Sequence, residues 1–248
     1  MHILIALLPS LLWGAMALLN AAFPAEPRRQ NTFVIAGGGA ASLLTSPLTG
    51  ATWSLHSLAW GMLSGLLWSI GIIFLLKGFQ TWGTSRTMPL TAALQLTLNG
   101  LIGVVLLGEW RAPGAMGLGL GAIVLVIAGG AAGAWQEGDG AGPGPGARRI
   151  GALATVCSAV FLAVYPGMLR LARVSSADAV GPMGIGLLVG AVVASRVLPR
   201  NGPLRGGGMV PALLSGVVWA LGNIALLRST SIVGVAAGFT FSQLGFVI

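Results

Sequence analysis

Long apolar segments follow one another along almost the whole chain, separated by short polar connections. Each segment approaches the roughly 20 residues that a helix needs to cross a bilayer. We therefore predict an all-α membrane protein with about nine spans. The predicted spans cover residues 3–23, 32–48, 55–77, 87–108, 114–135, 150–169, 180–198 and 209–227, and a ninth begins near residue 232.

Polar and aromatic residues recur at helical spacing between Ser64 and Asn99, which the pattern divides into two helices. Residues four apart lie on one helix face, so each series forms a stripe. Two facing polar stripes inside apolar helices predict a lined cavity. The first stripe comprises Trp60, Ser64 and Trp68, and the second comprises Thr91, Gln95 and Asn99.

The same segment returns 151 residues later in the chain. Trp68 then aligns with Trp219, and Gly83 aligns with Gly234. The match of tryptophan, glycine and a basic helix end at a single offset indicates an internal duplication. The predicted units are a five-helix repeat at 1–135, a Gly/Pro-rich linker at 136–149 and a second repeat at 150–248 that stops within its fourth helix.

Five spans per repeat is an odd number, so the second repeat should enter the membrane from the opposite side. Inverted repeats of this kind are a common transporter plan, with the substrate site near the midplane. The parity also predicts ten helices, so the chain should lack the end of the ninth and all of the tenth.

Basic residues predict the orientation of the helices. Nine lysines and arginines lie in connections after odd-numbered spans and four in connections after even-numbered spans. The positive-inside rule then places the N-terminus outside the cell.

Composition supports the membrane assignment and excludes other classes. Only 7% of the 248 residues are charged, and 55% are hydrophobic. The net charge of +8 is spread singly or in pairs between apolar segments, so we expect no nucleic-acid partner. No nucleophile–base pair or cluster of metal ligands stands out, so we expect neither an enzyme nor a cofactor. The sequence leaves the oligomeric state open.

The candidate site residues are donors, acceptors and flat rings on predicted helices. Such groups suit a small polar ligand, since binding sites combine apolar walls with a few placed polar groups. Intramembrane amides also act as glue between helices, and that alternative stays open. The candidates are Trp13, Asn20, Ser64, Trp68, Thr91, Gln95, Asn99, Tyr165, Trp219, Asn223 and Gln243.

Glu109 is the only acidic residue near a span boundary in the motif LLGEW. It is a candidate coupling group for a proton, because a proton carrier needs a titratable side chain in its pathway. The alternative is a helix cap or an ion pair with Arg111.

Three stretches resemble the glucose/ribose porter family of the drug/metabolite transporter superfamily. They are ILIALLPSLLWG, GTSRTMPLTAALQL with LLGEW, and WALGNIALL followed by VGVAAGFTFSQLG. The resemblance implies a ten-helix carrier in a bacterial plasma membrane that takes up a monosaccharide such as glucose or ribose, coupled to protons. Two alternatives stay open: an exporter of amino acids or other small metabolites, and an accessory membrane protein without transport activity.

Overall fold

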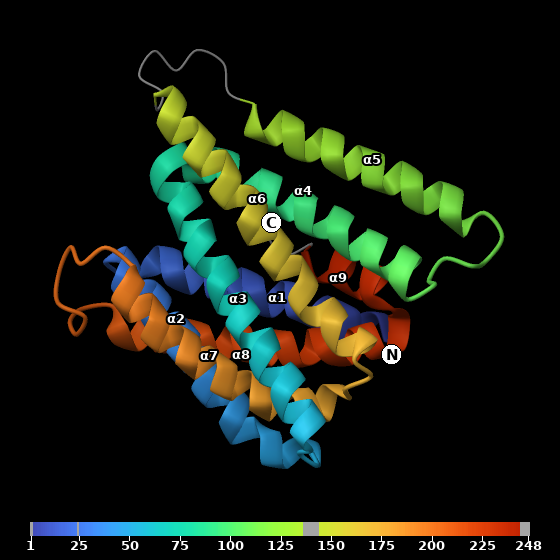
Figure 1. Cartoon of the computed structure of the whole chain (residues 1–248), viewed down its shortest axis with the longest axis horizontal. Coiled ribbons are helices and arrows are strands. Elements are labelled where there is room, and N and C mark those ends of the chain that lie inside the picture. Colours follow the sequence, from blue (N-terminus) through green and yellow to red (C-terminus); the bar gives the residue numbers. More distant parts are fainter. Residues whose placement is uncertain (1, 24, 136–143, 244–248) are drawn as a thin grey trace.

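The computed structural model describes residues 2–23, 25–135 and 144–243, and within these ranges every regular element is a helix (Figure 1). The helices are α1 (His2–Ala22), α2 (Pro27–Thr45), the 3-10 helix η1 (Ser46–Thr49), α3 (Leu55–Trp82), α4 (Thr84–Leu101), the π-helix η2 (Ile102–Leu106), α5 (Ala115–Ala134), α6 (Pro145–Leu171), α7 (Ser176–Val197), α8 (Met209–Val233) and α9 (Val235–Gln243).

Eight of these helices, α1 to α8, are long and apolar enough to cross a membrane. The chain is therefore a multi-pass membrane protein, and eight predicted spans have a helix in the expected place. The ninth begins as α9, and residues 244–248 lie outside the described residues.

Helices α2 and α6 each begin five residues before the predicted boundary. Helix α2 begins at Pro27, because a proline fits the first helical position and the Glu26 carboxylate accepts a hydrogen bond from the Arg29 N–H at 2.9 Å. Helix α6 begins at Pro145, inside the predicted linker. Residues 145–149 therefore belong to α6, and residues 136–143 of the predicted linker lie outside the described ranges.

The extensive packing runs between the N-terminal and the C-terminal halves of the chain. Helix α3 packs on α6 and α7, and α8 packs on α1 and α2. A methyl group at Gly65 would overlap the Met183 carbonyl, and one at Gly216 would overlap the Val34 carbonyl. Small residues allow membrane helices this close approach.

Glycines break the helices at equivalent places in the two halves. Helix α3 ends before Gly83 and α8 ends before Gly234, and both glycines have φ of 91°. Only glycine adopts this conformation without strain. The two breaks lie 151 residues apart, at the spacing of the sequence repeat.

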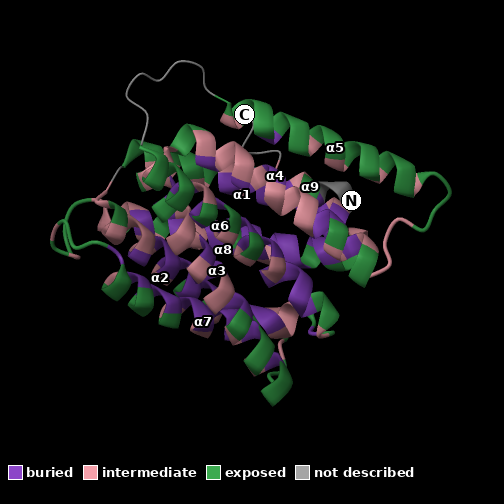
Figure 2. Ribbon diagram, turned by 45° about the horizontal axis from the view of Figure 1, so that its top comes forward, coloured by how far each residue is buried: buried purple, intermediate pink, exposed green. Residues whose placement is uncertain are grey.

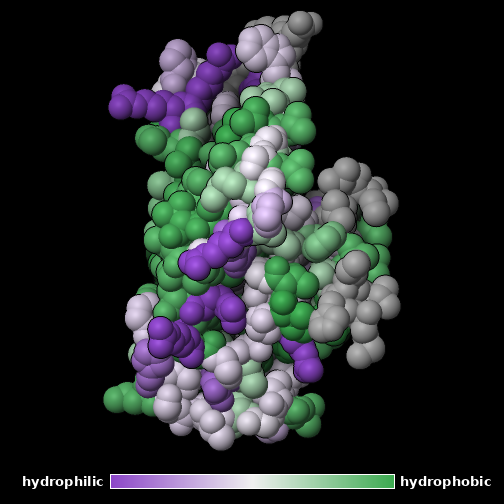
Figure 3. Space-filling view, turned by 90° about the vertical axis from the view of Figure 1, so that its right-hand side faces the viewer, coloured by the Kyte–Doolittle hydropathy of each residue, from purple (hydrophilic) through white to green (hydrophobic). Residues whose placement is uncertain are grey.

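Helix α5 lies at the edge of the bundle, where it packs on α4 (Figure 1). It is exposed along most of its length, whereas α6, α7 and α8 are largely buried (Figure 2). Its exposed side chains are apolar, among them Leu118, Val124 and Leu125, as expected of a surface that faces lipid. Hydrophilic residues gather instead in patches on the end of the molecule seen in Figure 3.

Candidate functional site

Two stacked tryptophans lie at the centre of the bundle. The rings of Trp68 on α3 and Trp219 on α8 have centroids 3.9 Å apart and planes inclined by 36°. Each side chain is 4% exposed. The indole N–H of Trp13 on α1 donates to the Trp219 carbonyl at 3.3 Å, so three helices meet at this ring pair.

A chain of polar groups adjoins the tryptophans. The Tyr165 hydroxyl on α6 donates to Oδ1 of Asn223 at 3.1 Å. The Asn223 amide in turn donates to the thioether sulfur of Met183 at 3.3 Å. Ser64 on α3 donates to the Tyr165 carbonyl at 3.2 Å and lies 3.8 Å from the same sulfur. We call Trp13, Ser64, Trp68, Tyr165, Met183, Trp219 and Asn223 the central cluster.

The central cluster has one weak link with chemical consequences. A thioether is a poor hydrogen-bond acceptor, whereas an amide N–H is a strong donor. Asn223 is 1% exposed, so water does not reach its amide, and the acceptor of the amide is the weak thioether sulfur. A ligand hydroxyl would be a better acceptor, so this donor is available for exchange.

Further buried polar atoms on α4, α6 and α8 have no hydrogen-bond partner among the residues that the structure describes. They include the hydroxyls of Thr91, Ser158 and Ser215 and the Oδ1 atom of Asn99. The Asn99 amide donates back to the Gln95 carbonyl at 3.0 Å, which leaves its oxygen unused. An unsatisfied buried polar group costs about 1–3 kcal/mol. Water or a polar ligand would relieve that cost.

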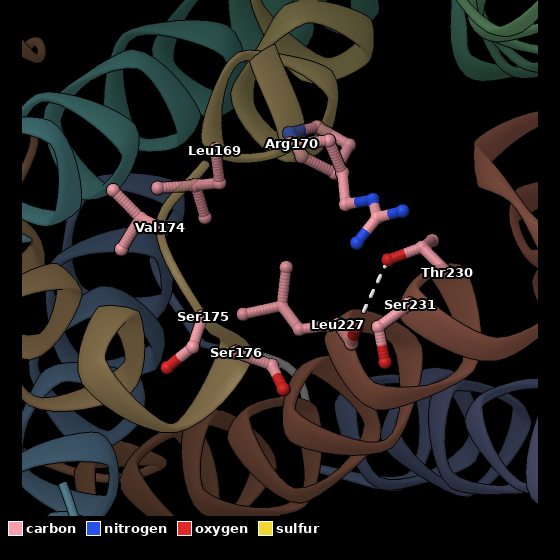
Figure 4. A pocket seen from close by; sticks show the side chains of 9 residues that line it. Leu169, Arg170, Val174, Ser175, Ser176, Leu227, Thr230 and Ser231 are labelled. Atoms are coloured by element: carbon pink, nitrogen blue, oxygen red, sulfur yellow. Dashed lines mark hydrogen bonds between the residues drawn. The ribbon is translucent and has the colours of Figure 1, made fainter. Parts of the chain in front are cut away.

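A pocket of about 230 Å³ opens between the C-terminal ends of α6 and α8 (Figure 4). Arg170 points across it toward Thr230, and the hydroxyls of Ser175 and Ser176 lie at its edge (Figure 4). The Thr230 hydroxyl itself donates to the Leu227 carbonyl at 2.9 Å. The pocket therefore combines one guanidinium with several hydroxyls.

Two leucines separate this pocket from the central cluster. Leu169 follows Tyr165 by one turn on α6, and Leu227 follows Asn223 by one turn on α8. Both line the pocket and both are buried, at 2% and 3% exposure. A helical turn rises about 5.4 Å, so the cluster lies just beneath the pocket floor.

Glu109 forms a cap on α9 from the loop that follows η2. Its carboxylate accepts hydrogen bonds from the N–H groups of Val235 at 2.7 Å and Ala236 at 3.1 Å. These donors would otherwise be unpaired at the helix start, where the macrodipole also favours a negative charge. The structure thus shows Glu109 as a helix cap, one of the two alternatives to proton coupling considered above.

The structure joins six predicted site residues in the central cluster. They are Trp13, Ser64, Trp68, Tyr165, Trp219 and Asn223. Thr91, Gln95 and Asn99 lie on α4. Helix α4 packs mainly on α5 and α6, whereas α3 packs mainly on α6 and α7. Asn20 is half-buried near the end of α1, and Gln243 ends the described part of α9 with a 3.4 Å contact to Ser242.

Sequence reasoning missed Met183 and the pocket above the central cluster. Met183 belongs to an apolar segment of α7, where nothing in the residue pattern distinguishes it from its neighbours. The pocket depends on where α6 and α8 end relative to each other. Its polar lining residues lie at or near helix ends, where polar side chains do not by themselves indicate a pocket.

Membrane-crossing helices around a buried polar centre, with a pocket one turn above it, define a multi-pass membrane transport protein. The family model described as sugar transport protein matches residues 4–248, and the chain belongs to that family. The family and its members' names denote transporters of sugars, not enzymes. The predicted resemblance to a sugar porter family is confirmed.

Several curated relatives match the whole chain. Glucose uptake protein GlcU of Bacillus subtilis is 34% identical over 100% of this chain and 85% of its own length. A putative sugar uptake protein of Listeria monocytogenes is 30% identical over 100% of this chain and 86% of its own. A solved crystal structure that is 22% identical has a TM-score of 0.61 and covers 99% of this chain and 88% of that one, a likeness of fold alone.

Proposed function

We propose that this protein is a secondary active transporter that takes up a monosaccharide, of the glucose or ribose type, across the plasma membrane of a bacterium. The observation that carries the proposal is the central cluster, in which two stacked indoles adjoin a tyrosine, an asparagine and a serine. A sugar has C–H faces that pack on aromatic rings and hydroxyls that donate and accept. The relatives named for glucose or sugar uptake support this substrate class.

Binding would exchange weak internal contacts for stronger ones. A sugar ring inserted between Trp68 and Trp219 would replace ring-on-ring contact with C–H packing on both indoles. A hydroxyl of the sugar would replace the Met183 sulfur as acceptor for the Asn223 amide. The unpaired Asn99 oxygen and Ser158 hydroxyl offer further partners along α4 and α6. Sugar binding would thus supply partners to polar groups that have none among the described residues.

Alternating access would follow from an inverted repeat with units at 1–135 and 150–248. The proposal is supported by the matched helix breaks at Gly83 and Gly234 and by the matched contacts of Gly65 and Gly216. With the N-terminus outside, the pocket at Arg170 would be the outer entrance. Leu169 and Leu227 would then form the gate that closes the outer entrance above the sugar.

Proton coupling would be located at Glu109. A protonated carboxyl offers one fewer acceptor, so proton binding would weaken its hold on the start of α9. The E109Q variant should then lose accumulation driven by a pH gradient and retain exchange of labelled for unlabelled sugar. Equal loss of both activities would remove Glu109 from the coupling step and leave it a structural cap.

The direct test is sugar uptake into proteoliposomes that contain the purified protein. We expect accumulation of radiolabelled glucose or ribose, and a loss of at least tenfold in N223L. A matched control is L118A, because Leu118 lies on the exposed side of α5. If no sugar in a broad panel is accumulated, or if N223L only lowers stability and transports at the normal rate, the proposal fails.

A further inference from the structure

A second hollow lies at the end of the molecule where α5 ends and α6 begins. Its volume is about 480 Å³. Figure 1 places the turn between α3 and α4 at the same end. The lining residues are Trp82, Arg86, Ala134, Trp135, Arg148, Arg149 and Ala152, and we call this site the arginine hollow.

Close helix contacts fix the walls of the arginine hollow. A methyl group at Gly151 on α6 would overlap Trp82 at the end of α3. A methyl group at Gly133 on α5 would come within 3.1 Å of Pro89 on α4. The first contact holds Trp82 beside the start of α6, and the second holds the end of α5 beside α4. Close packing therefore fixes the helix ends that carry the side chains of the hollow.

Arg148 and Arg149 bring positive charge to the arginine hollow. None of the described residues that line it is acidic, and Arg86, which also lines it, has an interaction of its own. The guanidinium groups of Arg148 and Arg149 make no hydrogen bond or ion pair within the described ranges, and both residues are exposed. By contrast, Arg29 at the start of α2 donates to the carbonyls of Leu204, Pro203 and Gly207.

The start of α6 adds to the positive potential. Its first turn contains no acidic residue, and Gly144 provides no side-chain cap. Free N–H groups and the positive end of the helix dipole both favour an anion here. Arg148 and Arg149 follow within the next turn, where two cations would otherwise oppose the dipole. An anion in the hollow would interact with Arg148, Arg149 and the start of α6 together.

The surroundings indicate that the anion is carried by a lipid. Trp82 and Trp135 flank the hollow at helix ends, and tryptophan is enriched where headgroups meet the hydrocarbon. Helix α5 packs on α4 and has no comparable contact with α6 among the described residues, so apolar flanks lead into the hollow from the side. Basic pockets between membrane helices suit phospholipid headgroups.

We propose that the arginine hollow binds the phosphate headgroup of an anionic phospholipid, with Arg148 and Arg149 as the principal ligands and the acyl chains along the α5–α6 side. This site is separate from the central cluster and does not depend on the transported substrate. The bound lipid would tie α5 to α6 at a point where the chain itself provides little packing.

The test measures thermal unfolding of the purified full chain in neutral detergent with added phospholipid. Phosphatidylglycerol should raise the melting temperature of the wild-type protein by about 5 °C more than phosphatidylcholine does. R148Q/R149Q should lose most of that difference. The matched control is R200Q/R205Q, which removes two exposed arginines between α7 and α8, outside the hollow, and should keep it.

Three results would overturn the proposal. If both double variants lose the phosphatidylglycerol effect on the melting temperature equally, the lipid is attracted to the basic surface in general. If R148Q/R149Q keeps the full effect, the lipid does not bind in the arginine hollow. An equal rise with inorganic phosphate would identify a free anion as the ligand instead of a lipid. As a second measurement, brominated phosphatidylglycerol should quench tryptophan fluorescence more in wild type than in W135F, and this excess should vanish with R148Q/R149Q.

Discussion

Removing the carboxylate of Glu109 should destabilise the protein through one identifiable contact, the cap on α9. The E109A variant leaves the N–H groups of Val235 and Ala236 without their acceptors at 2.7 and 3.1 Å. Losing a helix cap typically costs about 0.5–2 kcal/mol. Hydrogen bonds to charged groups are worth about 1.5–3 kcal/mol each. Because Glu109 is half-buried, we expect a total near 2–3 kcal/mol.

The assay is thermal unfolding of the purified protein in mild detergent. For a chain of this size each kcal/mol lowers the melting temperature by about 2–4 °C, so E109A should melt about 5–10 °C earlier. E109Q keeps an acceptor and should lose about half as much. The matched control is E26A, which removes a cap with a single hydrogen bond, to the Arg29 N–H at 2.9 Å. If E109A melts at no lower temperature than E26A, the two hydrogen bonds of Glu109 do not stabilise the protein more than the single bond of Glu26, and the expected effect of the cap on α9 is refuted.

Three further predictions concern the bundle. W68A should lower stability by about 3–5 kcal/mol and abolish sugar-dependent stabilisation, whereas W68F should keep part of both, as measured by melting with and without sugar. G216A should destabilise by more than 1 kcal/mol because its methyl meets the Val34 carbonyl, while G121A on the open side of α5 should be neutral or stabilising by up to about 1 kcal/mol. S231C in a C157S background should react with an impermeant thiol reagent added outside intact cells, and no labelling would contradict the proposed orientation.

The apolar pattern predicted most of the fold because each membrane helix must satisfy its own backbone, so that length and hydropathy alone mark the spans. Helix ends were less predictable. The start of α2 depended on a single capping carboxylate at Glu26, and the start of α6 on Pro145 inside a stretch whose composition is typical of a linker. Local chemistry therefore shifted both starts by about one turn or more.

The candidate site was only partly predictable for a related reason. Trp68 and Trp219 were predicted to be related by the 151-residue spacing, and the structure stacks them. The partner of Asn223 could not be found this way, since a methionine in an apolar helix carries no distinguishing signal. Likewise, the partner of Glu109 lies 126 residues away, a distance that local spacing cannot bridge. Periodicity predicts the helix face on which a residue lies, but it does not predict which atom of another helix that residue contacts.

The position of the Glu109 cap connects the fold to the proposed transport cycle. Helices α3 and α4 meet at Gly83, and α8 and α9 meet at Gly234, with the same backbone conformation. A methyl group at Gly234 would come within 2.8 Å of the Glu109 carboxylate, so the acid lies against the second break. Residues that absorb backbone rotation are typical hinges. Under the proposed coupling, a proton on Glu109 would weaken its two hydrogen bonds to the start of α9 and favour motion of α9 relative to α8.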